Sequence, residues 1–185
     1  MSMQDEFDPD DNFGDFDADD GLDDEAGHDG DLEQLVWQWL LRINPGDDDA
    51  AMQQLLAFRE RLNGDDAPEV VLESLASATD WRAAFRIHED EHTTLVDVLE
   101  ALASRFRVEF DWDVEDPTDP GLLADLGAFG LLEAAYDQLR VAGYTLWTWE
   151  TGDDTVAGAI AAREDDEAMR VIGQALGLDL RPGPG

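Results

Sequence analysis

The sequence predicts a single domain with an α+β fold. We expect a mixed sheet of about four strands with helices packed on it, and a pair or triplet of helices N-terminal to the sheet. Three observations lead to this prediction. Apolar residues recur at three- and four-residue steps in the first third of the chain, as on amphipathic helices. Strand-like alternation follows in the middle and last thirds. The 185 residues, 43% of them hydrophobic, are enough for one compact core and too few for two.

The first predicted elements are helices. Helical spacing of apolar residues runs over residues 32–43, and Asp31 precedes it as a favourable N-cap. A second apolar face covers residues 52–62 and stops at Gly64. A shorter third helix should start near Pro68, because proline suits the first turn of a helix.

The middle of the chain changes in pattern from strand to helix and back. Residues 81–87 alternate like a strand, 94–105 have helical spacing, and 107–112 alternate again. A strand, helix and strand of these lengths predict a crossover unit with parallel pairing. A long helix should then occupy residues 122–141 and end at Gly143.

The last third predicts a hairpin and a closing helix. Strands over 144–149 and 155–162 are separated by turn-forming residues at 151–154. The second strand has a face of mainly small residues, which should pack tightly under a helix: Val156, Gly158, Ile160 and Ala162. A final helix is expected over 165–176, followed by a disordered end from Arg181 to Gly185.

The charge is strongly negative, at −35, and every basic side chain is arginine. Such a chain cannot rely on phosphate neutralisation, so we expect it to bind no nucleic acid. It has no cysteine, which excludes disulfides, thiol catalysis and cysteine-ligated zinc. No signal peptide or membrane span is recognisable, and we therefore expect a soluble, cytoplasmic protein with no membrane partner.

The acidity divides the chain into three predicted regions: a disordered acidic tail over 1–30, a single α+β domain over 31–181, and a disordered end over 182–185. Residues 1–31 contain 14 acidic residues and no arginine. The tail either keeps the protein soluble or, through its three phenylalanines, folds on a basic partner. The rest of the chain still has a charge of −21, which is compatible with a basic partner, phosphate mimicry or a high-salt cytoplasm.

One segment matches a zinc-peptidase pattern. His88, Glu89, Glu91 and His92 fit H-E-x-x-H in one direction and H-x-x-E-H in the other. That chemistry requires both imidazoles on one face of a helix, with the glutamate activating a bound water. Here the motif should fall across a strand-to-helix turn, where the imidazoles share no face. An exposed acidic turn is the competing interpretation.

A second carboxylate-rich segment resembles the start of a calcium loop. Asp111, Asp113 and Glu115 alternate as such ligands do, but Asp116 stands where glycine belongs and Leu122 where a bidentate glutamate belongs. A weaker cation site remains open, with Asp119 beside it and completed by carboxylates of the later hairpin: Glu150, Asp153 or Asp154. In so acidic a chain, such clusters also arise by composition.

The six tryptophans are expected mostly in the core, because each buries a large area. Trp147 and Trp149 lie two apart, on one face of a strand. If that strand is at a sheet edge, one or two tryptophans could instead be hot spots in a protein contact. The chain has no phosphate-binding glycine loop and no G-x-S-x-G element.

Several short motifs together resemble an uncharacterised bacterial domain family of unknown function. They are Ile43-Asn44-Pro45-Gly46, Phe110-Asp111-Trp112, Glu115-Asp116-Pro117, Gly143-Tyr144-Thr145-Leu146-Trp147 and Glu150-Thr151-Gly152-Asp153. The resemblance covers roughly residues 32–182. It implies a single α+β domain and no catalytic residues.

The leading hypothesis is a non-enzymatic, cytoplasmic interaction domain that binds a basic protein, as an immunity protein, an antitoxin-like inhibitor or a nucleic-acid mimic does. A metal-dependent hydrolase using residues 88–92 is the alternative. A housekeeping domain adapted to high salt is the third possibility. We assign no catalytic, cofactor-binding or metal-ligating residue and no cofactor, and the sequence leaves the oligomeric state open.

Overall fold

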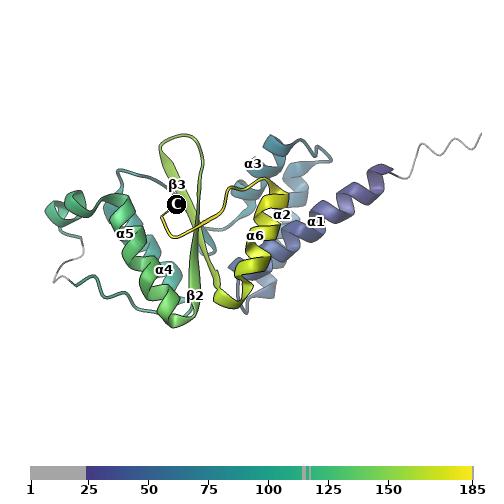
Figure 1. The fold of residues 1–185 in the computed structure, drawn as a ribbon. Coiled ribbons are helices and arrows are strands. Elements are labelled where there is room, and N and C mark those ends of the chain that lie inside the picture. The colour runs from purple at the N-terminus through teal and green to yellow at the C-terminus, as the bar shows by residue number, and fades with distance from the viewer. Residues whose placement is uncertain (1–23, 114–115, 117, 185) are drawn as a thin grey trace, which may run out of the picture.

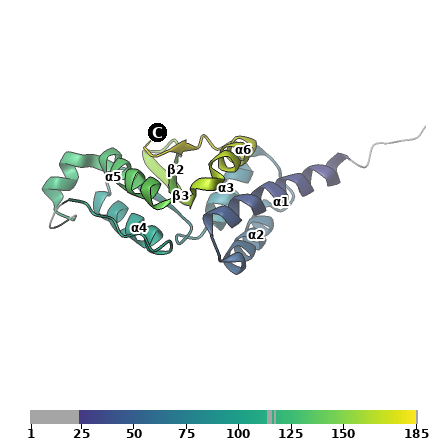
Figure 2. The same cartoon turned by 60° about the horizontal axis from the view of Figure 1, so that its bottom comes forward.

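A four-stranded sheet lies between two groups of helices in the computed structural model, which describes residues 24–113, 116 and 118–184 (Figures 1 and 2). One group covers one face of the sheet: α1 (Asp24–Ile43), α2 (Asp48–Leu62), α3 (Pro68–Ala78) and α6 (Asp166–Leu176). The other face is covered by α4 (His92–Ser104) and α5 (Pro120–Ala142). The α+β fold class and the packed N-terminal helices are thus confirmed.

The sheet is built around the C-terminal hairpin. Its strands are β1 (Ala84–His88), β2 (Tyr144–Glu150), β3 (Thr155–Ala162) and β4 (Arg181–Pro182), in the order β1-β3-β2-β4. All of the pairings are antiparallel. The predicted hairpin is confirmed. It places β3 in the interior of the sheet and β1 at one end, with a strand neighbour on only one side among the described residues.

Each face of the hairpin supports a separate core. Trp147 and Ala159 are fully buried against the α1 and α6 side. Leu146 and Ile160 are buried just as deeply against α4 and α5. Because successive strand residues point to opposite faces, a strand buried on both sides loses the polar alternation of a half-exposed strand.

A close contact within the sheet is at Gly158, which pairs with Phe85 of β1. A Cβ added to Gly158 would lie 2.5 Å from the Phe85 ring and 2.9 Å from the carbonyl oxygen of Trp147. Glycine therefore makes room for the Phe85 ring on the α4 and α5 side. The tight packing was expected under a helix, but at Gly158 the contact is with a side chain of the neighbouring strand.

The first helix begins earlier than predicted. Helix α1 starts at Asp24, so Asp31 lies inside the helix and is not its N-cap. Acidic residues in a first helical turn interact favourably with the positive end of the helix dipole, and this stabilises the early start. Residues 24–30, which we assigned to the tail, are helical; residues 1–23, with the three tail phenylalanines, lie outside the described residues.

The predicted strand over 107–112 is wrong, and with it the parallel crossover. Arg107 adopts a left-handed conformation (φ 59°) that turns the chain directly after α4. Beyond it, the Asp111 backbone is bound by a side chain: its N–H donates to the Gln138 amide oxygen at 2.8 Å, and its carbonyl accepts from the Gln138 NH2 group at 2.9 Å. Alternate residues of this segment pack on the α4 and α5 core. This packing explains the alternating apolar pattern, although the segment pairs with no strand.

The C-terminal segment is also more ordered than predicted. Arg181 and Pro182 form β4, which pairs with Thr148 and Trp147. Gly183 N–H then donates to the Leu146 carbonyl at 2.8 Å. Proline is tolerated here because β4 is an edge strand, whose outward N–H positions need no partner.

The long helix α5 covers all of the predicted residues, extends beyond them at both ends, and is interrupted. Gly127 has φ 64° and ψ 176°, which breaks the helical path. Asp119 caps the start, accepting from the N–H groups of Gly121 and Leu122, and Gly143 ends the helix with φ 90°. Both ends therefore follow from ordinary capping preferences.

Replacing Gly158 with alanine should destabilise the protein by about 1–3 kcal/mol, because the added methyl group overpacks against Phe85. The matched control is Gly30→Ala on α1, where a Cβ meets nothing within 4 Å. That change should be neutral or stabilising by roughly 0.5–1 kcal/mol, since alanine favours helices. Urea unfolding of both variants checks the prediction, and equal effects would contradict it.

Candidate binding groove

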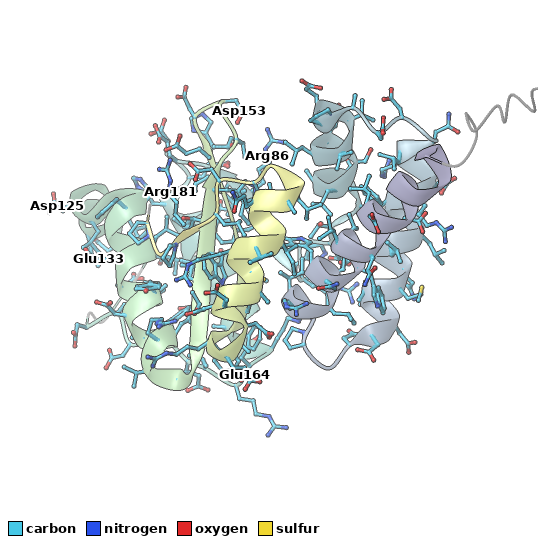
Figure 3. All side chains as sticks on the ribbon, turned by 45° about the vertical axis from the view of Figure 1, so that its right-hand side comes forward. Arg86, Asp125, Glu133, Asp153, Glu164 and Arg181 are labelled. Atoms are coloured by element: carbon cyan, nitrogen blue, oxygen red, sulfur yellow. The ribbon has the colours of Figure 1, made fainter. Side chains whose placement is uncertain are left out.

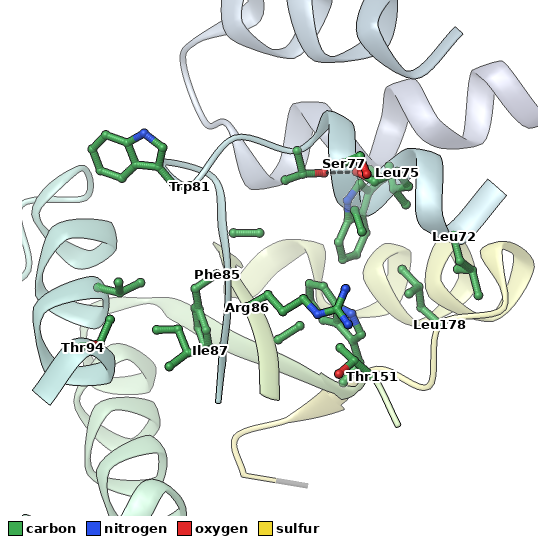
Figure 4. A pocket seen from close by; sticks show the side chains of 17 residues that line it. Leu72, Leu75, Ser77, Trp81, Phe85, Arg86, Ile87, Thr94, Thr151 and Leu178 are labelled. Atoms are coloured by element: carbon green, nitrogen blue, oxygen red, sulfur yellow. Dashed lines mark hydrogen bonds between the residues drawn. The ribbon is translucent and has the colours of Figure 1, made fainter. Parts of the chain in front are cut away.

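An apolar groove of about 460 Å³ surrounds the free edge of β1 (Figure 4). We call it the β1 groove; the residues that define it are Leu72, Leu75, Trp81, Arg86, Val98 and Trp149. Its walls come from α3 on one side of the strand and α4 on the other. The groove is therefore formed by elements that are separated along the sequence and meet at the end of the sheet.

A short turn before β1 places Trp81 at the end of the groove. The Asp80 carboxylate accepts from the Arg82 N–H at 2.9 Å, and the Asp80 carbonyl accepts from the N–H groups of Ala83 and Ala84. This arrangement is typical of aspartate in turns. Trp81 is left 68% exposed, with the Arg82 guanidinium 5.6 Å from its ring centroid.

The floor of the groove on the α3 side is aromatic and aliphatic. Trp149 meets Trp39 edge to face, with ring centroids 5.7 Å apart. Trp39 and Leu75 are almost completely buried, whereas Trp149 and Leu72 are partly exposed and can contact a ligand. An edge-to-face pair in contact with the core holds such a surface rigid.

Arg86 crosses the groove from β1 to the hairpin. Its guanidinium donates to Asp153 at 2.6 Å, and Figure 3 shows the two side chains at the same end of the sheet. Asp153 also accepts hydrogen bonds from the hydroxyls of Thr151 and Thr155. These two hydroxyls first, and then Arg86, lower the pKa of Asp153 to about 2.

Charged side chains of both signs stand around the groove. Arg82 is paired with Asp80 at 3.6 Å and Arg86 with Asp153 at 2.6 Å. Arg105, which donates to the Arg82 carbonyl, has no ion pair among the described residues. Glu69 and Asp97 are exposed on α3 and α4, the helices that wall the groove, and likewise have no ion pair there, whereas Glu73 lines a separate cavity on α3. The negative charge that bears on a partner is therefore that of the whole chain, −35.

The histidine motif falls across a strand-to-helix turn, as predicted. His88 is the last residue of β1, His92 the first of α4, and His88, Glu89 and Glu91 are exposed. Glu91 is the N-cap of α4. Within the described parts of the chain, no three histidine or carboxylate side chains converge as metal ligands do. The hydrolase alternative thus lacks the shared helical face that its chemistry needs.

The carboxylates of the calcium-like segment accept hydrogen bonds from nearby groups of the same loop. Asp111 accepts from the N–H of Asp113 at 3.0 Å, and Asp119 caps α5. Asp116 accepts from both the hydroxyl and the N–H of Thr118, which lowers its pKa. Glu115 lies outside the described residues. These oxygens therefore bind N–H and O–H groups of the loop.

The hairpin carboxylates are likewise held apart. Glu150 pairs with Arg181 at 3.2 Å, while Asp153 pairs with Arg86. Asp154 has a left-handed backbone (φ 54°) at the turn, and its carbonyl accepts from Glu89 N–H at 3.0 Å. The structure therefore does not bring them to the 111–119 segment as a shared site.

Of the six tryptophans expected mostly in the core, Trp39 and Trp147 are buried, Trp37, Trp112 and Trp149 are half-buried, and Trp81 is exposed. Trp147 is fully buried, and Trp149 on the same face is partly buried. The large exposed surface belongs to Trp81, which precedes an edge strand. Its signal in the sequence is the neighbouring Asp80, which favours a turn there over the predicted strand.

Comparison with protein families identifies the class. The family model described as "Domain of unknown function (DUF6630)" matches residues 35–183. The chain belongs to this family, and the resemblance found in its short motifs is confirmed. No curated protein and no solved structure matches it. Among the helices that the structure describes, none is both long and apolar enough to cross a membrane.

The Asp153 carboxyl should titrate near pH 2. In the unfolded chain the ordinary value is 3.8, so its stabilising contribution is complete above pH 3.8 and is lost as the pH falls from 3.8 towards 2. Carbon-13 NMR titration of this carboxyl tests the prediction. Thr151→Val should raise the pKa more than Arg86→Ala, because the threonine bond has the larger effect; the reverse order would contradict this account.

Treatment with EDTA should leave the melting temperature unchanged, because no described side chains converge as a metal site. Elemental analysis of protein purified without chelator accompanies the melt. His88→Ala and His92→Ala variants serve as controls and should melt like the parent in both conditions. A stoichiometric transition metal whose removal lowers the melting temperature would restore the hydrolase hypothesis.

Proposed function

We propose that this chain is a non-enzymatic protein-interaction domain whose β1 groove binds a segment of a basic protein. The observation that supports this most directly is Trp81, 68% exposed at the end of an apolar groove. Large exposed aromatic side chains beside a concave apolar surface are typical of binding hot spots. The groove supplies contact area, and the rigid aromatic floor limits the entropy lost on binding.

The charge favours a basic partner. The chain has a net charge of −35, and Glu69 and Asp97, on the two helices that wall the groove, have no ion pair among the described residues. A positively charged protein would be attracted over a distance comparable to the Debye length, about 8–10 Å at physiological salt. Long-range attraction of this kind accelerates association, while the apolar contact sets the lifetime of the complex.

The expected complex is sensitive to Trp81 and to salt. Immobilised full-length protein is incubated with an extract of its source cells, retained proteins are identified by mass spectrometry, and the most enriched is purified for titration. We expect a partner with a high isoelectric point. Trp81→Ala should weaken its binding at least about 30-fold, since hot spots contribute 2 kcal/mol or more. Raising the salt concentration should weaken it further.

Val141→Ala is the matched control, because Val141 is 91% exposed on α5 and is not among the groove residues. This variant should bind as the parent does. Circular dichroism confirms that both variants are folded. Affinity that is indifferent to ionic strength, or equal for the two variants, would refute the proposed function.

A further inference from the structure

We infer that the β1 groove binds its partner by strand addition: an extended segment of the basic protein pairs with the free edge of β1. This inference rests on the proposed function and specifies its geometry. The groove is lined by residues from both faces of the strand, such as Val98 on one side and Leu72 on the other. Because the opposite edge of β1 is bonded to β3, a continuous groove can join these faces only around the free edge.

The register shows which backbone groups point outward. Glu89 N–H donates to the Asp154 carbonyl of the hairpin at 3.0 Å. In an antiparallel ladder, residues that bond to the neighbouring strand alternate with residues that do not. Phe85 and Ile87 therefore bond to β3, and the N–H and carbonyl of Arg86, opposite Ala157, point to the free edge.

The ends of this edge are already used by turns. Ala84 N–H donates to the Asp80 carbonyl, and the His88 carbonyl accepts from Glu91 N–H. Four outward backbone groups lie between these bonds: the carbonyl of Ala84, the N–H and carbonyl of Arg86, and the N–H of His88. None of the four has a hydrogen-bond partner among the described residues. They form a row of donors and acceptors, as an edge strand presents to an added strand.

The features that usually protect such an edge are weak here. The strand Ala84–His88 contains no proline. Its one central charge, on Arg86, is held by Asp153, and Figure 4 shows the side chain directed towards Thr151 and the hairpin. The guanidinium therefore lies over the sheet and leaves the backbone of the edge accessible.

The two walls of the groove predict an alternating sequence in the added strand. Side chains opposite Arg86 enter the α3 side, where Leu72 and Trp149 form apolar walls and the Arg86 charge disfavours a second cation. The intervening side chains face α4, next to Val98 and its exposed neighbour Asp97. A long basic side chain suits this position, because its stem covers apolar surface and its charge reaches the carboxylate. The inferred ligand alternates apolar and basic residues.

Strand pairing can be tested with N-methylated peptides. The probe is a fluorescein-labelled nine-residue peptide of alternating valine and arginine, titrated by anisotropy against the full-length chain. In antiparallel pairing with β1, the orientation we infer, valines on the α3 side direct their N–H groups to β1, whereas arginines direct theirs to solvent. Methylating the valine amides should weaken binding at least tenfold, while methylating the arginine amides should leave it within about twofold. A valine and glutamate peptide should not bind.

A pair of variants at Arg86 tests the same backbone hydrogen bonds from the side of the protein. Arg86→Pro removes the outward N–H without touching the ladder to β3, and should abolish peptide binding. Arg86→Ala removes the same side chain but keeps the N–H, and should bind the peptide at least tenfold more tightly than Arg86→Pro does. Thermal unfolding establishes whether the proline variant is folded; if it is not, the methylated peptides decide the question with the unaltered protein.

The outcomes separate the two proposals. Equal binding of the two methylated peptides would overturn strand addition, and the proposed function would stand if Trp81→Ala still weakened the basic partner. Failure of the unmethylated peptide to bind, with a Trp81-dependent basic partner captured, would also overturn strand addition alone. If the glutamate peptide bound as tightly as the arginine peptide, the basic class of ligand would be wrong and both proposals would fail.

Discussion

The architecture depends on the burial of β3 on both faces and both edges. Its residues are mainly alanine and glycine, so helices on either side can approach the sheet closely, and the ring of Phe85 occupies the space above Gly158. Interiors are close-packed, and a strand of larger residues would push the two helical layers apart. The two cores lie on opposite faces of the sheet, and β1, β2 and β3 contribute side chains to both. The position of β1 follows directly, because β3 has β2 on one edge and β1 on the other.

The negative charge is distributed in two ways. Many carboxylates perform local tasks: Asp47 and Asp119 cap helices, Asp80 closes a turn, and Asp153 holds Arg86. Others stand exposed without cationic partners among the described residues, as beside the β1 groove. Exposed ion pairs contribute little to stability, so the surplus of acid is better understood through solubility and association than through folding. The net charge of the chain, −35, makes a partner of opposite charge the natural candidate.

The candidate site was only partly predictable from the sequence. The histidine motif could be placed on a turn because Ile87 and His88 continue a strand pattern and Leu95 begins a helical one. The carboxylates of the 111–119 segment matched a ligand spacing, yet hydrogen bonds to nearby backbone explain their positions. The groove itself was not predicted. Its residues come from four separate regions of the chain, and only the packing of α3 and α4 on either side of β1 brings them together.

The sequence by itself determined most of the local elements: the helices from their apolar period, the end of α5 from Gly143, and the hairpin from its turn residues. Family membership also followed from short motifs. Only the tertiary structure decided which alternating segments became strands. Residues 107–112 have a strand pattern but pack on helices, whereas Arg181 and Pro182, which have none, pair with β2. The reason is that alternation of apolar and polar residues indicates only that one face of a segment is buried. Strand pairing depends on whether the backbone of another strand lies at hydrogen-bonding distance. The free edge of β1 is what the sequence did not reveal.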